Sequence, residues 1–349
     1  MGGTGDNSEL RQRLRKGRLC VIHSGNVYDV TDFADRHPGG KEWLEKYVGQ
    51  DVTRIMEDQS PHKHTKAAFG IMAKYRVDDV SEQGHKQNGE PQSLGKDKFY
   101  SMETDTLVDW SKPIMSQIPS LGDEYYQWVH EPVDTTLRLF HYDFVETFSK
   151  CPWFMVPIIW VPVALFMLLR CYTNITTSPE PVLWHPFGIE LTVTPVAMFP
   201  LVFFGGVLWT FCEYTLHRWL FHMRPPSSVP ILMSLHFILH GQHHKTPMDR
   251  KRLVFPTVPA TIFATLILGL YGLFAPWPVA QAMFVGTLIG YIVYDLTHYY
   301  IHHGTPFTAY FRSLKRYHVK HHFEQQQLGF GISSKFWDYP FGTVIPDVD

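Results

Sequence analysis

The sequence predicts a two-part protein: a small α+β domain, then an all-α integral membrane domain with four transmembrane helices and a cytosolic, histidine-rich helical cap. Three observations lead to this fold class. The 349 residues are too many for one small module. The first third of the chain is polar, whereas the remainder contains long uncharged stretches. Most of the 20 histidines lie after position 210.

The composition excludes several classes of protein. The chain has 31 Lys and Arg against 33 Asp and Glu, so it lacks the basic excess that a nucleic-acid partner requires. Apolar residues make up 45% of the chain, which is too many for a disordered protein. The four cysteines are scattered without a Cys-x-x-Cys motif, so we expect neither a disulfide framework nor a thiolate metal site.

Residues 10–80 are expected to form the soluble domain, with strands at 19–22 and 27–30 on either side of a turn. The first twenty residues contain no apolar run, so we expect no secretory signal and a cytosolic amino terminus. Residues 81–124 are expected to be a linker, because 81–98 is rich in Gly, Gln and Lys and has almost no apolar residue.

Residues 125–349 are expected to form the membrane domain. A transmembrane helix needs about 20 apolar residues, and the uncharged stretches supply four spans, at about 151–169, 191–212, 254–274 and 278–296. Buried helices of a soluble core would not need runs of this length. Lys and Arg are concentrated between residues 213 and 252 and after residue 299. The positive-inside rule therefore predicts that both termini and the central loop are cytosolic.

A first candidate site lies in the soluble domain. His37 begins a His-Pro-Gly-Gly motif, and this tight turn can present an imidazole to a planar cofactor. His62 and His64 follow downstream, ahead of Ala67 and Ala68. Two imidazoles on opposite faces of a haem leave no open axial position, which suits electron transfer.

Over residues 10–80 the chain resembles the cytochrome b5 family. The resemblance rests on His37 to Gly40 and on the preceding Tyr-Asp-Val-Thr-Asp-Phe at 28–33. It implies haem b, with His37 as one axial ligand. The family pattern around the second ligand is altered here, and we prefer His64 to His62 because of its position before the two alanines.

A second candidate site is formed by ten histidines in four clusters on the cytosolic segments. Spacings of three and four residues place imidazoles on one helix face, where they can converge on a metal. His217 and His222 are five apart, so either they serve different metals or the helix ends before Pro225. His236 and His303 break the spacing, and we interpret them as outer-shell or incidental. The ten are His217, His222, His240, His243, His244, His298, His302, His318, His321 and His322.

Ten imidazoles are too many for one metal, and two metals with about five nitrogens each is the simplest interpretation. Imidazole suits zinc, copper, iron and nickel, so the ligands alone do not name the metal. An attached haem domain favours iron that activates dioxygen, since this chemistry consumes electrons one at a time whereas hydrolysis by zinc needs none. We infer oxidation of an unactivated C–H bond in a lipid-soluble substrate.

From Tyr125 to its end the chain resembles the membrane fatty acid 2-hydroxylases of the fatty acid hydroxylase/sterol desaturase superfamily. The resemblance is carried by 213–218, 221–222, 239–244, 253–256, 294–300, 318–322 and 330–333. It implies an oxidoreductase, a monooxygenase of the endoplasmic reticulum membrane that hydroxylates fatty acyl chains at C-2 with dioxygen, for 2-hydroxy sphingolipid (ceramide) synthesis.

The same resemblance implies that the ten histidines are the metal ligands and that no catalytic residue lies beyond them. It implies two metal ions: the oxidative chemistry expects di-iron, and zinc is seen in family structures. Electrons are expected to come from a flavin-dependent reductase through the haem.

Three other functions stay open at this stage. The same scaffold could perform desaturation or sterol methyl oxidation, and a membrane-tethered haem carrier could use its histidines to store or sense metal. A purely structural membrane protein is the third alternative. The substrate could be a free fatty acid, an acyl-CoA or a ceramide.

Overall fold

The structure is a computed structural model that describes residues 7–37, 39–57, 64, 66–77, 106–133 and 135–346. His62 and the polar stretch 81–98 lie outside the described residues.

The amino-terminal part is a small α+β unit, as predicted. The predicted hairpin is present: β1 and β2 pair antiparallel, with Cys20 opposite Asp29 and His23 opposite Asn26. Ser24 and Gly25 form its turn, and both have positive φ (48° and 78°), as two-residue hairpin turns require. The elements are α1 (Asn7–Arg15), β1 (Cys20–His23), β2 (Asn26–Asp29), η1 (Thr31–Arg36), α2 (Lys41–Lys46), α3 (Thr53–Glu57) and α4 (Lys66–Ala73).

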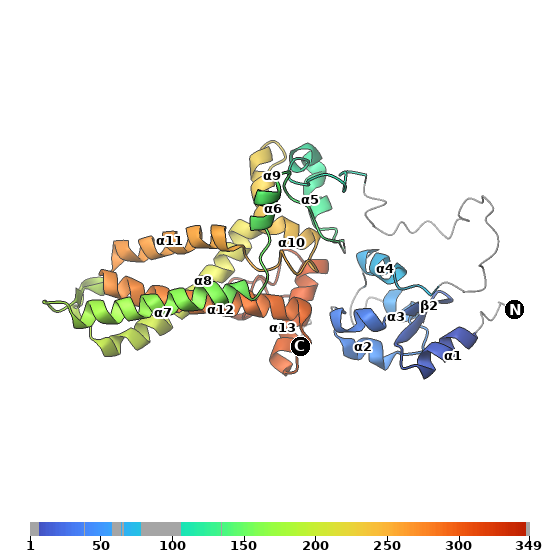
Figure 1. The fold of residues 1–349 in the computed structure, drawn as a ribbon, viewed down its shortest axis with the longest axis horizontal. Helices are drawn as coiled ribbons and strands as arrows, with labels where there is room; N and C mark the ends of the chain where they lie inside the picture. The colour runs from blue at the N-terminus through green and yellow to red at the C-terminus, as the bar shows by residue number, and fades with distance from the viewer. Residues whose placement is uncertain are drawn as a thin grey trace.

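Four long apolar helices follow, and each is long enough to cross a membrane. They lie side by side in Figure 1. The helices are α7 (Met155–Thr176), α8 (Met198–Thr215), α11 (Thr257–Phe274) and α12 (Trp277–His303). The fold class predicted from the sequence is confirmed. The span limits differ, because α12 continues to His303 and α8 passes directly into η5 (Leu216–Phe221), so both helices extend beyond the apolar run into histidine-bearing turns.

α12 is the central helix of this bundle, and glycines allow it to pack closely on α8. A Cβ on Gly205 would lie 1.8 Å from the Met283 carbonyl oxygen, and a Cβ on Gly286 would lie 1.8 Å from that of Val202. Most of the apolar window of α12 is therefore buried inside the protein (72%), against 6% for α11. α12 thus fixes the position of α8, while α11 mostly faces outward.

Short helices form a cap at one end of the bundle (Figure 1). They are η2 (Ile118–Glu124), α5 (Tyr125–Val129), α6 (Asp143–Phe148), α9 (Pro230–His236), η6 (Phe237–Gly241), α10 (Gln242–Lys245), α13 (Ala309–Phe323) and η7 (Phe336–Asp338). Ile114 and Ile118 are buried with Trp128 of α5 and Phe237 of η6 in one apolar core. The folded part that contains the cap therefore begins before residue 125, the start expected from the sequence. Between the helices, β3 (Leu183–Trp184) and β4 (Leu191–Thr192) pair on either side of η3 (Pro186–Gly188), and η4 (Pro195–Ala197) leads into α8.

Candidate metal centre

The ten clustered histidines meet in the cap, and all ten are buried. They come from η5, from the continuous segment η6–α10, from the end of α12 and from α13. Nine of them form two groups in which the ligand nitrogens lie within 4.8 Å of one another. The first group is His243, His298, His302, His318 and His322, and the second group is His217, His222, His240 and His321.

His217 and His222 are brought together by a π-helical turn. Their separation of five residues matches the hydrogen-bond period of a π-helix, and the His222 N–H donates to the His217 carbonyl at 3.0 Å. Both rings therefore join the second group, an arrangement that favours one shared metal over the alternative that they serve different metals. The sequence spacing contained this signal, which an α-helical reading could not use.

Neighbouring histidines on one helix are divided between the two groups. His240 lies in the second group and His243 in the first, and on α13 His321 is separated from His318 and His322 in the same way. His244 lies between the groups: its Nε2 is 3.1 Å from that of His222, and its ring stacks on His322 with centroids 4.2 Å apart. The continuous segment η6–α10 and helix α13 therefore each contribute to both groups.

The distances between ring nitrogens fit a shared metal. The Nε2 atom of His318 lies 3.0 Å from that of His298, 2.9 Å from that of His302 and 3.0 Å from that of His322. Nitrogens bound at about 2.1 Å to one ion lie about 3 Å apart at right-angle positions. In the second group, the Nε2 atoms of His217 and His240 are 3.1 Å apart.

Burial keeps these imidazoles in the form that binds metal. Burial, together with the neighbouring His321 and His303, lowers the pKa of His243 to about 3. Burial first, and then the adjacent rings, also lower the pKa values of His240 and His318 well below the ordinary value. A neutral imidazole has a free lone pair, so the site is ready for a cation at neutral pH.

Two histidines of the second group are oriented by backbone carbonyls from the carboxy-terminal part of the chain. The His217 Nδ1–H donates to the Phe330 carbonyl at 2.6 Å, and the His321 Nδ1–H donates to that of Leu328 at 2.7 Å. Each bond leaves Nε2 as the lone-pair donor, directed into the group. Sequence reasoning missed these partners, since a backbone carbonyl has no side-chain signature.

Three further histidines lie near the two groups. His130 was missed because it stands outside the clusters: its ring is 5.3 Å from that of His244, and its Nδ1–H donates to the Tyr126 carbonyl. His236 is hydrogen-bonded to the Tyr125 hydroxyl, so it joins α9 to α5. His303 lies beside His302 with ring centroids 6.2 Å apart.

In the amino-terminal unit, His37 is buried and its Nδ1–H donates to the Gly40 carbonyl at 2.7 Å. This bond leaves Nε2 as the ligand atom, which fits axial coordination of a haem iron. Gly40 has φ of 102°, a conformation that favours glycine. His64 precedes α4 and is half-buried, with its ring 6.3 Å from that of Phe69.

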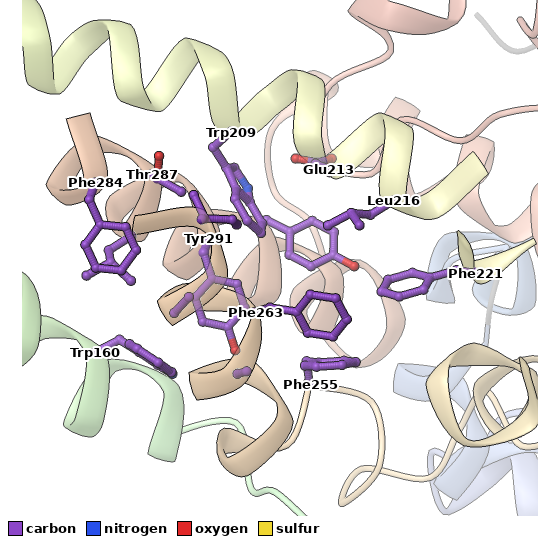
Figure 2. A pocket seen from close by; sticks show the side chains of 15 residues that line it. Trp160, Trp209, Glu213, Leu216, Phe221, Phe255, Phe263, Phe284, Thr287 and Tyr291 are labelled. Carbon is purple, nitrogen blue, oxygen red and sulfur yellow. The ribbon is translucent and has the colours of Figure 1, made fainter. Parts of the chain in front are cut away.

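A largely apolar cavity lies between the long helices, and two of its lining residues contact histidines of the two groups. Figure 2 shows aromatic rings of α8 and α12 around it, with Trp160 and Phe284 at one end and Phe221 at the other. Phe221 stacks on His240, with centroids 5.2 Å apart, and Tyr294 stacks on His298 at 6.0 Å. The empty space, including the part open to solvent, is about 670 Å³.

Comparisons with known proteins match both parts of the chain. Residues 6–81 match the cytochrome b5-like heme/steroid binding domain, and residues 202–343 match the fatty acid hydroxylase family. A fatty acid 2-hydroxylase of Rattus norvegicus is 42% identical over 98% of this chain and 95% of its own length. A ceramide very long chain fatty acid hydroxylase, scs7, of Schizosaccharomyces pombe is 34% identical over 94% of both chains.

The fold of the membrane part also matches a solved structure. A structure titled full-length scs7p, in which only the hydroxylase domain is visible, superposes with a TM-score of 0.60 at 32% identity. The match covers 71% of this chain and 89% of that one.

Proposed function

This chain belongs to the fatty acid 2-hydroxylase family, which it matches along nearly its full length, and from that premise we propose that it hydroxylates C-2 of a fatty acyl chain. The reaction uses dioxygen, and the product is the 2-hydroxy acyl group of sphingolipids. A relative named for ceramide supports an acyl chain destined for, or already part of, a ceramide.

The ten clustered histidines are the proposed ligands of two metal ions. Buried, neutral nitrogens at mutual distances near 3 Å fit such ions. An all-imidazole set suits iron and zinc alike, and we propose iron, because two iron ions supply dioxygen activation when bound. The chain's own contribution is to hold the ligands and to keep the surroundings apolar and dry.

The apolar cavity is the proposed site of the acyl chain. Since Phe221 and Tyr294 stack on histidines of both groups, a chain lying in the cavity brings its carboxyl end to the metals. Trp160 and Phe284, at the far end, would surround methylene groups. The cavity therefore determines which carbon is presented, whereas the metals determine the chemistry.

Electrons are proposed to reach the metals through haem b, bound by His37 and His64 in the domain at 10–80. The proposed donor is a flavin-dependent reductase. The protein resides in the endoplasmic reticulum membrane in this proposal, with both termini cytosolic, since Lys and Arg are concentrated in the segments that form the cap.

The observation that carries the proposal is that Phe221 and Tyr294, which line the cavity, each stack on a histidine of one of the two groups. The test is lipid mass spectrometry on cells that lack 2-hydroxy lipids and express the wild-type chain or a His37→Ala, His64→Ala variant. We expect 2-hydroxy acyl chains from the wild type and fewer from the variant. A product lighter by two hydrogens would instead identify desaturation, and unchanged hydroxylation in the variant would assign electron delivery to another carrier.

A further inference from the structure

Two buried carboxylates outside the histidine groups accept hydrogen bonds from the N–H groups of four consecutive residues, 330–333. The Glu213 carboxylate, on α8, accepts from the N–H groups of Ile332 (3.1 Å) and Ser333 (2.7 Å) and from the Ser333 hydroxyl. The Asp338 carboxylate accepts from the N–H groups of Phe330 (2.9 Å) and Gly331 (3.0 Å). Glu213 is 5% exposed and Asp338 is fully buried.

The segment that they hold, residues 330–333, forms one wall of the second histidine group. The Phe330 carbonyl accepts the Nδ1–H of His217, and the Phe330 ring contacts His222 and His321 with centroids 5.3 and 5.8 Å apart. A shift of this segment would therefore move the His217 ring and its Nε2. At Gly331 an added Cβ would lie 2.1 Å from the Ser334 carbonyl oxygen, so the close packing of this segment accepts only glycine there.

The spacing along α8 and η5, which are continuous, explains how they can both bond the 330–333 segment and carry a metal ligand. Thr210, Glu213 and His217 are three and four residues apart, so they project from one face in successive turns. Each turn bonds the same carboxy-terminal part of the chain: Thr210 accepts from the Trp337 indole, Glu213 holds 332–333, and His217 donates to Phe330.

The charges in the cap add a second reason for the carboxylates. An all-histidine ligand set is neutral, so two divalent ions would bring four positive charges into a buried site without a compensating ligand. A buried carboxylate is costly unless it is hydrogen-bonded or near a cation. Glu213 has three donors and holds the peptide groups at 331–333. Asp338 accepts from the Gly331 N–H, which shares a peptide group with the Phe330 carbonyl, so it strengthens that carbonyl as the acceptor for His217, as carboxylates do for metal-bound histidines in other sites.

We propose that Glu213, assisted by Asp338, is a positioning residue for the metal of the second histidine group, acting through the 330–333 segment and the Phe330 carbonyl on His217. The inference rests on the metal centre of the proposed function. It assigns a purpose to the Phe-Gly-Ile-Ser motif at 330–333.

The test measures how fast zinc(II) leaves the full-length protein, loaded with zinc and challenged with a chelator that absorbs visible light on binding zinc. The wild type is expected to release two ions per chain. In Glu213→Gln we expect one of the two to leave roughly 10–100 times faster, the range for loss of an outer-shell partner, while the other keeps its rate. Ser333→Ala removes one of the three bonds and should accelerate the same phase by less.

Thr210→Val is the matched control, since it removes a bond to Trp337 from the same helix face and leaves residues 330–333 held. It should release both ions at wild-type rates. Wild-type release from Glu213→Gln, or equal acceleration of both ions, overturns the proposal. If Glu213→Gln does not fold, as judged by gel filtration, the zinc release rates of Ser333→Ala and Asp338→Asn test the proposal instead. Wild-type release rates in both variants overturn the proposal. A wild type that binds no zinc would instead contradict the metal centre itself.

Discussion

The two histidine sites of this chain are oriented in opposite ways. In the amino-terminal unit, His37 is held by a carbonyl three residues further along the same turn. In the cap, His217 is held by a carbonyl 113 residues away, and its group draws ligands from three separate segments of the chain. The first site is local, whereas the second exists only when distant elements are assembled.

This difference teaches where each site is vulnerable. The orientation of His37 needs little beyond its own loop, so changes in the membrane part should leave it intact. The metal centre depends on the packing of α8 against α12 and on the carboxy-terminal segment, because α12 carries His298 and His302 while α8 leads directly into η5, where His217 lies. Disturbance far from the histidines should therefore damage the metal centre and spare the haem site.

Among the changes that separate the metal centre from the haem site, His318→Ala should cause the largest loss of activity. His318 is central to the first group, with three other Nε2 atoms within 3.0 Å. Losing it should reduce 2-hydroxy product by more than the roughly 100-fold that an outer-shell partner can cost. The haem absorption spectrum should not change, since His37 is fixed within its own turn.

The control for this variant is His185→Ala, which removes an exposed histidine that pairs with Glu190. Product, metal content and haem spectrum should all match the wild type. A His318→Ala protein that keeps two metals and normal product would contradict the metal assignment, and one that loses its haem would contradict the independence of the two sites.

The same contrast explains what the sequence could and could not predict. The hairpin, the four spans and the histidine clusters are set by local patterns: a turn, about 20 apolar residues, or helical spacing. The division of His240 and His243 between two groups is not local, because it depends on which rings of α12 and α13 approach them. The roles of the Phe330 and Leu328 carbonyls could not be predicted from the sequence either, since every residue carries a backbone carbonyl.

The π-helical turn at His217 is an intermediate case. Its spacing of five was visible in the sequence, yet a π turn is rare and its stability depends on tertiary contacts. Glu213 was equally visible as an acidic residue at the end of an apolar run. Its partners at 332–333 could not be inferred, because they are more than 115 residues away.

The second prediction tests whether helix packing alone can break the metal centre. In Gly286→Ala the new methyl group would meet the Val202 carbonyl, so α8 and α12 must separate. Overpacking of this kind costs about 1–3 kcal/mol, and it moves His217 relative to His298. We expect a lower melting temperature in detergent and loss of metal, while the haem spectrum persists.

Gly269→Ala is the matched control, since it lies on α11 with no atom within 4 Å of the added Cβ. A helical glycine replaced by alanine in open space is neutral or stabilising by up to about 1 kcal/mol. Equal melting temperatures for the two variants would show that the close contact between α8 and α12 is not what holds the metal centre together.

The smallest change in stability should come from neutralising one buried carboxylate in each part of the chain and comparing the melting temperatures across pH. Glu146 of α6 accepts from the backbone of Leu139 and is paired with Lys150 and with the buried Arg252. Burial alone would raise its pKa, but the hydrogen bond from Lys150, the backbone amides and Arg252 outweigh this and lower the pKa. A lowered pKa in the folded state stabilises it above the ordinary carboxyl pKa, and this stability is lost as the pH falls through the lowered value.

Glu146→Gln should therefore lower the melting temperature most at pH 7, by a few degrees for a cost of about 1–3 kcal/mol, and the difference from wild type should shrink toward pH 4. The counterpart in the amino-terminal unit is Asp29→Asn, whose wild-type carboxylate is bonded to Thr31 and paired with Arg18 and has a lowered pKa for the same kind of reason. Arg18 is far more exposed than Arg252 (38% against 1% of the side chain), so solvent screens this pair and the shift should be smaller. If Asp29→Asn instead destabilised the protein more than Glu146→Gln, the amino-terminal unit would be the more vulnerable part, and the contrast between a robust local site and a fragile assembled one would fail.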